Sequence, residues 1–299
     1  MKTYLKLFLR NVKLYFKDKG LFFTSLITPL ILLVLYATFL SNVYRQSYVS
    51  AVPAGLVIPE KVLDALVAGQ LFSSLLAVCC ITVAFCCNML MVQDKITGAR
   101  NDIMMTPVKK STVAISYFTA TFVCTFIICM IASVACFIYL AIVGWYLSVK
   151  AVFAIILDVF LLSMMGTVLS SVINYFLSSQ GQISAVGSIV SSCYGFICGA
   201  YMPISSFGSG LQKVLSFFPG TYGTSLLRNH TMNGAFAEMQ KSGLPDVLVN
   251  GLKDGTDCNI YFFGSQVSQP VMYAVVIGTV ALLLVAYVLI NVLSKRKSK

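Results

Sequence analysis

The chain has 299 residues, of which 58% are hydrophobic and only 10% are charged, and it carries a net charge of +11. Soluble domains are about 45–50% apolar and about 25% charged, because a surface in water needs charged groups. The composition therefore excludes an ordinary soluble domain and indicates an integral membrane protein.

The stretch before the first long apolar run, residues 1–19, has the pattern of an amphipathic helix. Its basic residues fall within an arc of about 80° when successive residues are placed about 100° apart. They are Lys2, Lys6, Arg10, Lys13 and Lys17, and a separate apolar stripe contains Leu5, Phe8, Leu9, Val12, Tyr15 and Phe16. Such a helix is predicted to lie in the membrane interface. It could serve only as a topology anchor, or it could also be an elbow that touches a cytoplasmic partner.

Six apolar runs are long enough to cross a bilayer, which takes about 20 helical residues. They are Leu21–Leu40, Leu66–Val92, Val113–Val143, Val152–Leu177, Ile183–Met202 and Val271–Leu293. Lipid offers the backbone no hydrogen-bond partners, so each run is predicted to be a helix, and Pro29 is predicted to kink the first one. We therefore predict an all-α integral membrane fold with six transmembrane helices in one transmembrane domain, residues 1–299.

The loop between the second and third spans, residues 93–110, is longer and more polar than the joining of two antiparallel helices requires. Its distinctive residues are Asp94, Gly98, Arg100, Asp102, Thr106 and Pro107. A short helix along the membrane is predicted at Ile103–Met105, ending before Pro107, because proline disfavours helix at the preceding residue.

A second long connection, residues 203–269, separates the fifth and sixth spans. Leu211, Val214, Leu215 and Phe218 have i, i+3, i+4, i+7 spacing, which predicts a short amphipathic or re-entrant helix at the outer interface. The polar remainder, as far as Asp257, is predicted to form a small helical cap.

The distribution of Lys and Arg predicts the orientation. With six spans and both termini in the cytoplasm, 14 of the 21 basic residues lie inside, in agreement with the positive-inside rule. These are the six between Lys2 and Lys19, together with Lys95, Arg100, Lys109, Lys110, Lys295, Arg296, Lys297 and Lys299. The prediction is a multi-pass protein of the plasma or inner membrane. The positive charge is a topological signal with some attraction to anionic lipid, and nucleic-acid binding is not expected.

Polar residues inside the spans are few. Asp158 is the one acid within a span, and either a structural hydrogen-bonding role or a transport role fits it. The fifth span carries small polar residues, namely Ser184, Gly187, Ser188, Ser191, Ser192, Gly195 and Gly199. Small residues allow close helix contact or line a cavity, so this helix is predicted to face protein near a dimer axis or a substrate pathway. Asn88, beside Cys86 and Cys87, is the next most polar position.

Signals for catalysis or metal binding are weak. The sequence contains no G-x-x-x-x-G-K-[ST], H-E-x-x-H or G-x-S-x-G motif. His230, the only histidine, is predicted to be a solvated loop residue, and the cysteines are predicted to be packing residues because nine of the ten lie in apolar runs. The chain is therefore predicted not to be an enzyme, and to bind neither a metal nor a cofactor of its own.

The order of these pieces resembles a known family. The basic N-terminus from Arg10 to Lys19 and a first span with an early proline are similar to the start of a type-2 ABC exporter permease. The loop with Asp94, Gly98 and Thr106-Pro107-Val108 is similar to that family's cytoplasmic segment, although Gln93-Asp94-Lys95 replaces its usual Glu-rich lead-in. Met202-Pro203 through Phe218-Pro219 is similar to its outer re-entrant region.

The resemblance implies a half-transporter that dimerises with a second permease copy or a homologue. Two separate ABC ATP-binding subunits would bind ATP and Mg and drive the outward movement of a drug, peptide, lipid or glycan. The elbow and the coupling helix would meet the ATPase through Arg10, Lys13, Lys17, Asp94, Gly98, Arg100 and Pro107. Substrate would pass between the second and fifth spans, along Asn88, Ser184, Ser188, Ser191 and Ser192.

Two other classes stay open from the sequence. An ion-coupled secondary transporter would be expected to show repeated halves and several buried charges. An intramembrane enzyme would be expected to show paired His, Glu or Asp residues in its spans, and the lone Asp158 argues against it.

Overall fold

The structure is a computed structural model that describes residues 2–53, 56 and 58–293, and it is almost entirely helical. The longer helices are α1 (Lys2–Lys17), α2 (Lys19–Leu35), α3 (Ser41–Ala51), α4 (Glu60–Cys87), α5 (Met89–Ile96), α7 (Lys110–Val143), α8 (Val149–Phe176), α9 (Gln180–Ile197), α11 (Pro219–Lys241), α12 (Asp246–Gly255) and α13 (Gln269–Leu293). Shorter elements are the π-helix η1 (Tyr36–Leu40), α6 (Ala99–Met105), the 3-10 helix η2 (Ile204–Ser206), α10 (Ser209–Leu215) and the antiparallel strands β1 (Tyr261–Phe262) and β2 (Ser265–Gln266).

Five helical segments of the described residues are long and apolar enough to cross a membrane, so the chain is an all-α, multi-pass membrane protein. They are Lys19–Ala51, Glu60–Ile96, Lys110–Val143, Val149–Phe176 and Gln269–Val292. The first segment is longer than the predicted run to Leu40, because η1 and α3 continue α2 as far as Ala51. The predicted fifth span is shorter than expected: α9 ends at Ile197 and is not among the five.

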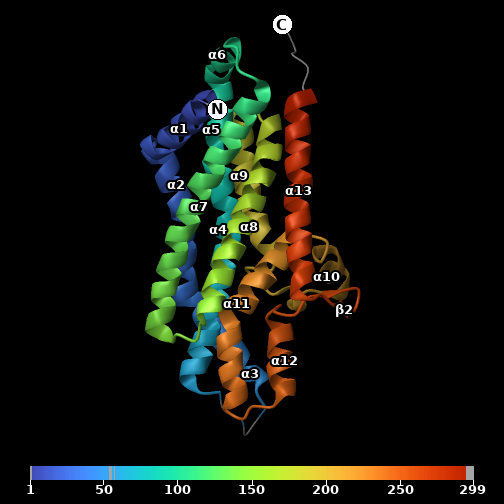
Figure 1. Ribbon diagram of the computed structural model, residues 1–299. Coiled ribbons are helices and arrows are strands. Elements are labelled where there is room, and N and C mark those ends of the chain that lie inside the picture. Colours follow the sequence, from blue (N-terminus) through green and yellow to red (C-terminus); the bar gives the residue numbers. More distant parts are fainter. Residues whose placement is uncertain (1, 54–55, 57, 294–299) are drawn as a thin grey trace.

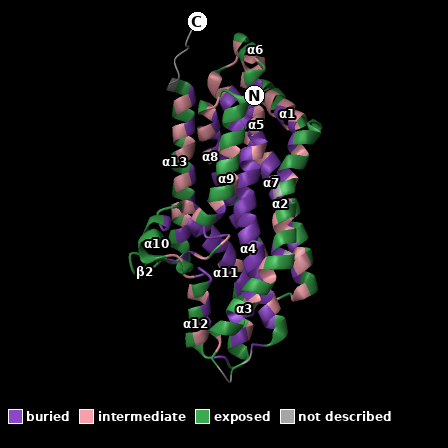
Figure 2. Ribbon diagram, turned by 180° about the vertical axis from the view of Figure 1, so that it is seen from behind, coloured by how far each residue is buried: buried purple, intermediate pink, exposed green. Residues whose placement is uncertain are grey.

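Helix α4 forms the centre of the bundle. Every residue from Ala65 to Phe85 is buried, and the neighbours of α4 are α2, α7, α8, α9 and α11. Figure 2 shows α4 as a nearly continuous buried element. A helix that is apolar on all its faces can bury all of its apolar surface only when other helices enclose it on every side. This explains the central position of α4.

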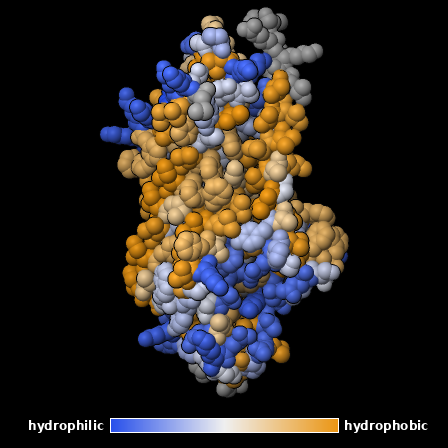
Figure 3. All heavy atoms as spheres, viewed as in Figure 1, coloured by the Kyte–Doolittle hydropathy of each residue, from blue (hydrophilic) through white to orange (hydrophobic). Residues whose placement is uncertain are grey.

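The two ends of the bundle differ in character. One end, here the α6 end, carries α1, α5, α6 and the last described turns of α13 (Figure 1). The other, the α12 end, carries α3, α12, the start of α4 and the end of α11. Figure 3 shows an apolar band along the helices and a hydrophilic α12 end. The basic residues predicted at the C-terminus, Lys295, Arg296, Lys297 and Lys299, lie outside the described residues.

The segment 203–269 differs most from the prediction. Its longest helix, α11, is not part of a solvated cap along its whole length, because most of its residues are buried against α4, α8 and α13. Small residues permit this close packing: a Cβ at Gly223 would lie 2.4 Å from Leu162 Cδ2, and one at Gly234 would lie 1.8 Å from the Tyr146 carbonyl oxygen. The polar sequence of α11 did not indicate this buried position, because its polar side chains form their hydrogen bonds inside the protein.

Helix α10 and the hairpin β1–β2 project sideways beside the start of α13 (Figure 1). Phe217 contacts Phe262 and Phe263 edge-on, and Lys213 Nζ lies 5.9 Å from the Phe263 ring centroid. Of the predicted amphipathic set on α10, Leu215 is buried whereas Leu211 and Val214 are exposed. The apolar face of this short helix therefore points partly away from the protein.

Candidate functional site

At the α6 end, one ion pair joins the N-terminal helix to the bundle. Arg10 Nη1 and Nη2 donate to the two carboxylate oxygens of Asp94, at 2.7 and 3.2 Å. The Tyr117 hydroxyl on α7 donates to the same carboxylate at 2.5 Å. Because the Asp94 side chain is only 8% exposed, three helices are connected through one buried carboxylate. A two-point arginine–carboxylate pair is among the stronger and more directional protein contacts.

On its other side, α5 is attached to the end of α8. Lys95 Nζ donates to three backbone carbonyl oxygens there, those of Asn174 at 2.9 Å, Tyr175 at 2.6 Å and Leu177 at 3.1 Å. The last carbonyl groups of a helix lack internal partners and carry partial negative charge, so a lysine is a favourable cap for them. Helix α5 is thereby held between α1, α7 and α8.

Helix α6 follows directly after α5 in the chain. Gly98 has φ +84°, a conformation that favours glycine, and it turns the chain into α6. Ile103 and Met104 pack against a buried cluster with Tyr117, whereas Met105 is 82% exposed. The structure thus presents a short helix with one anchored and one exposed face at the tip of the bundle.

The predicted ATPase-contacting residues fall into two groups. Lys13, Lys17 and Pro107 are exposed, and the Arg100 guanidinium lies over the Tyr175 ring with 5.8 Å to its centroid. The Asp94 carboxylate is buried and is bonded to Arg10 and Tyr117, so it joins α1, α5 and α7 within the chain. Its contact with the ATPase stays a prediction.

The predicted pathway residues also separate. Ser184, Ser188 and Ser192 on α9 are exposed and Ser191 is half-buried, so this helix carries a face of small polar residues that no other part of the described chain covers. Asn88 does not share that face. Its Nδ2 donates to Ser170 and Ser171 Oγ, both at 3.1 Å, and it is fully buried. Asn88 is thus a hydrogen-bonded core residue between α4 and α8, apart from the α9 face, and its pathway role stays a prediction.

Asp158 has partners that the sequence did not indicate. His230 Nδ1 on α11 lies 2.6 Å from its Oδ2, and the Tyr273 hydroxyl on α13 donates to its Oδ1 at 2.7 Å. The prediction that His230 is a solvated loop residue is wrong, because it lies within a helix and its side chain is only 16% exposed. The cluster joins three helices around a carboxylate that would otherwise be unpaired.

Arg228 is the residue that sequence reasoning missed most clearly. Its guanidinium is 1% exposed and donates to Asp257 Oδ2 at 3.0 Å and to the Gly199 carbonyl oxygen at 2.5 Å. Asp257 also accepts from the backbone N–H groups of Ile204 and Ser205. The available signal was an arginine directly preceded by the small residues Thr224-Ser225 and the apolar pair Leu226-Leu227.

The cysteines are free thiols. Cys258, the one outside the apolar runs, is buried, and burial raises the pKa of its thiol to about 11. The thiol is therefore protonated near neutral pH, which suits a packing residue and not a nucleophile.

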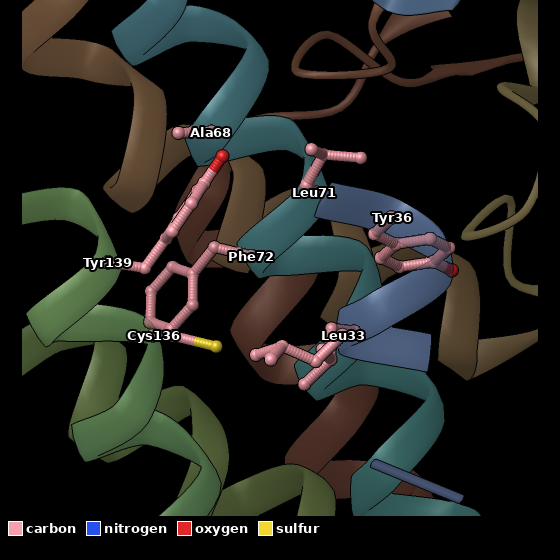
Figure 4. Close-up of a pocket in the computed structure, with 8 residues that line it drawn as sticks. Leu33, Tyr36, Ala68, Leu71, Phe72, Cys136 and Tyr139 are labelled. Atoms are coloured by element: carbon pink, nitrogen blue, oxygen red, sulfur yellow. The ribbon is translucent and has the colours of Figure 1, made fainter. Parts of the chain in front are cut away.

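A small cavity of about 50 Å³ lies between α2, α4 and α7. Figure 4 shows Cys136 and Tyr139 facing Phe72, with Leu33 and Tyr36 on the other side. Tyr36 is also the first residue of the π-helical segment η1. The space is one or two water volumes, so it is a packing gap and not a site for a larger molecule.

The fold defines a class, that of multi-pass helical membrane proteins. A family model described as "ABC-2 family transporter protein" matches residues 58–293, which is most of the chain. The chain belongs to the ABC-2 transporter family. No curated protein matches it. Permeases of this family are membrane transport domains and are not themselves catalytic.

Proposed function

We propose that this chain is the permease subunit of an ATP-driven exporter, driven by two copies of a separate ABC ATP-binding subunit that hold the ATP and Mg. ABC-2 permeases typically work with such subunits. The observation that carries the proposal lies at the α6 end of the bundle. There the exposed helix α6 directly follows α5, which is bonded to α1 and α7 through Asp94 and to α8 through Lys95. Drugs, peptides, lipids and glycans remain the candidate substrates.

In this proposal the ATPase docks against α6 and the exposed side of α1. A displacement of α6 passes through Gly98 into α5, which continues α4 across the bundle. The Arg10–Asp94 pair carries the elbow with it, and Lys95 carries the end of α8. Rigid elements held together by a few strong contacts move as a unit, which is what mechanical coupling requires.

Replacing Gly98 by Val or Arg100 by Ala is expected to uncouple ATP hydrolysis from transport while membrane insertion stays intact. A side chain at φ +84° costs about 1–2 kcal/mol, so the coupled conformation of α6 should fall about 5- to 30-fold in population. The measurement is substrate-stimulated ATP hydrolysis and transport by the complex in lipid vesicles. Asn101→Ala, an exposed position on the same helix, is the matched control. If both variants bind their ATPase and transport like the parent, α6 is not the coupling helix.

The proposed topology has both termini and α6 in the cytoplasm, with α9 as a sixth membrane-spanning element. In a background without native cysteines, Arg100→Cys is expected to react with an impermeant thiol reagent only after lysis. Val247→Cys, 84% exposed on α12, is expected to react in intact cells. The Lys and Arg distribution supports this orientation. Reaction of Arg100→Cys in intact cells would contradict this topology and place α6 on the outer side of the membrane.

The proposed dimer contact and export pathway use the small-residue face of α9. Enlarging Ser188 or Ser191 to Leu is expected to weaken dimerisation or transport about fivefold or more, because overpacking a close contact costs about 1–3 kcal/mol. Cross-linking yield and export rate are the measurements. Ala281→Leu on the exposed face of α13 is the control for a larger side chain in lipid. Normal assembly and export in both serine variants would move the interface elsewhere.

A further inference from the structure

The hairpin β1–β2 carries an exposed group of aromatic rings. Phe262 and Phe263 lie at its tip, and Phe217, just after α10, packs edge-on against both of them. All three side chains are exposed. We call residues 259–266 together with Phe217 the aromatic hairpin. Exposed apolar side chains that adjoin one another mark a contact with another molecule or with a membrane.

The turn of this hairpin holds a bulky ring where the backbone favours a small residue. Phe262 pairs with Ser265, so Phe263 and Gly264 form a two-residue turn, with φ +49° and +88°. Turns with two positive φ values favour Asn-Gly or Gly-Gly, because this conformation is strained for a bulky side chain. Phe263 is nevertheless 59% exposed. Burial within the chain therefore does not offset the strain, whereas an apolar contact outside the chain would.

The position of the aromatic hairpin indicates which contact this is. Ile260 and Val267, at its base, pack in one cluster with Met272 and Val276 of α13, and the Val267 N–H donates to the Ile260 carbonyl oxygen at 2.8 Å. The hairpin is thereby held at the level of the first turns of a membrane-spanning helix. Figure 3 shows an apolar surface on this projection that adjoins the apolar band along the helices. The rings thus continue the lipid-facing surface of α13.

The distribution of charge agrees with a lipid contact. From Cys258 to Leu293 the chain has no charged residue. The cation beside the rings is Lys213, whose Nζ lies 5.9 Å from the Phe263 ring centroid. Lysine side chains lay their carbon chains along apolar surfaces and extend the ammonium group towards water or phosphate. Aromatic rings with a neighbouring lysine are typical of a segment at the membrane–water interface.

We infer that the aromatic hairpin lies in the head-group region of the bilayer leaflet at the α12 end, with Phe217 and Phe263 against the lipid acyl chains. The partner of this surface is the lipid bilayer and not a second copy of the chain. The contact fixes the depth at which α13 enters the membrane. The inference does not depend on the proposed export function, because it uses only the position of the hairpin beside a membrane-spanning helix.

Tryptophan fluorescence tests the inference with the full-length protein in phosphatidylcholine nanodiscs. Trp145 is the only tryptophan of the chain, so Phe263→Trp in a Trp145→Phe background reports on one position. Leu282→Trp, 68% exposed on α13, is the reference for lipid, and Val247→Trp, 84% exposed on α12, is the reference for water. The iodide quenching constant of Phe263→Trp is expected to be at least about threefold lower than that of Val247→Trp, because an interfacial ring lies about 5–10 Å below the membrane surface.

Brominated phosphatidylcholine measures the lipid contact directly. Quenching of Phe263→Trp should lie within about twofold of that of Leu282→Trp, and bromine near the carboxyl end of the acyl chain should quench Phe263→Trp more strongly than bromine near the methyl end. Phe217→Trp is the second reporter if Phe263→Trp does not elute as a monodisperse protein. Quenching by iodide as strong as that of Val247→Trp would place the hairpin in water. Protection from both quenchers would show that protein covers it, as in a contact between two copies, and stronger quenching from the methyl end would place it in the bilayer interior. Each of these three results would overturn the inference.

Discussion

Replacing Arg228 by Met is expected to lower the free energy of unfolding by about 3–5 kcal/mol, because it leaves a buried carboxylate without its counter-charge. Asp257 is only 5% exposed and also holds the backbone of residues 204 and 205. Removal of the Arg228 guanidinium should therefore weaken the connection between α9, α11 and α12. The measurement is thermal unfolding of the purified protein in detergent or nanodiscs.

The matched control is the ion pair between Lys241 and Glu238 near the end of the same helix. The Lys241 side chain is 73% exposed, so Lys241→Met should change the free energy of unfolding by no more than about 1 kcal/mol. The double variant Arg228→Met, Asp257→Asn removes both buried charges and should recover part of the stability. Equal melting temperatures for Arg228→Met and Lys241→Met would show that the buried pair is not a main support of this region.

Replacing Gly166 by Ala is expected to destabilise the bundle by about 1–3 kcal/mol, the cost of overpacking a close helix contact. A Cβ at this position would lie 2.6 Å from the Cys80 carbonyl oxygen and 3.1 Å from Ala84 Cβ. The atom that the new Cβ would meet belongs to the backbone of α4, which cannot rotate away as the end of a flexible side chain can. Helix α8 must therefore move away from α4. The higher helix propensity of alanine, about 1 kcal/mol, is not enough to compensate.

Gly278→Ala on α13 is the control for this change, because a Cβ there meets nothing within 4 Å. It should be neutral or stabilising by up to about 1 kcal/mol. Thermal unfolding and the yield of monodisperse protein are measured for both variants side by side. A Gly166→Ala protein as stable as Gly278→Ala would mean that α4 and α8 separate more easily than their contact suggests.

The sequence by itself determined the membrane class, four of the long spans and the family of the protein. These depend on local properties, namely the apolar length of each helix and the composition around it. The amphipathic helix α1 was predicted for the same reason, because its periodicity can be recognised within a few residues. The short helix predicted at Ile103–Met105 is present and ends where Pro107 indicated, but it begins earlier, at Ala99. The C-terminal end of the first span was not predicted, because η1 and α3 continue this helix beyond its apolar part.

The tertiary structure alone decided which polar groups meet. Asp158 and His230 are 72 residues apart in the chain, and Arg10 and Asp94 are 84 apart. The local sequence distinguishes a buried, hydrogen-bonded polar residue from a solvated one only weakly, because the free energy that favours burial comes from its distant partner. For that reason the sequence of α11 predicts part of a polar helical cap, yet this helix packs inside the bundle, where His230 contacts Asp158 and Arg228 contacts Asp257.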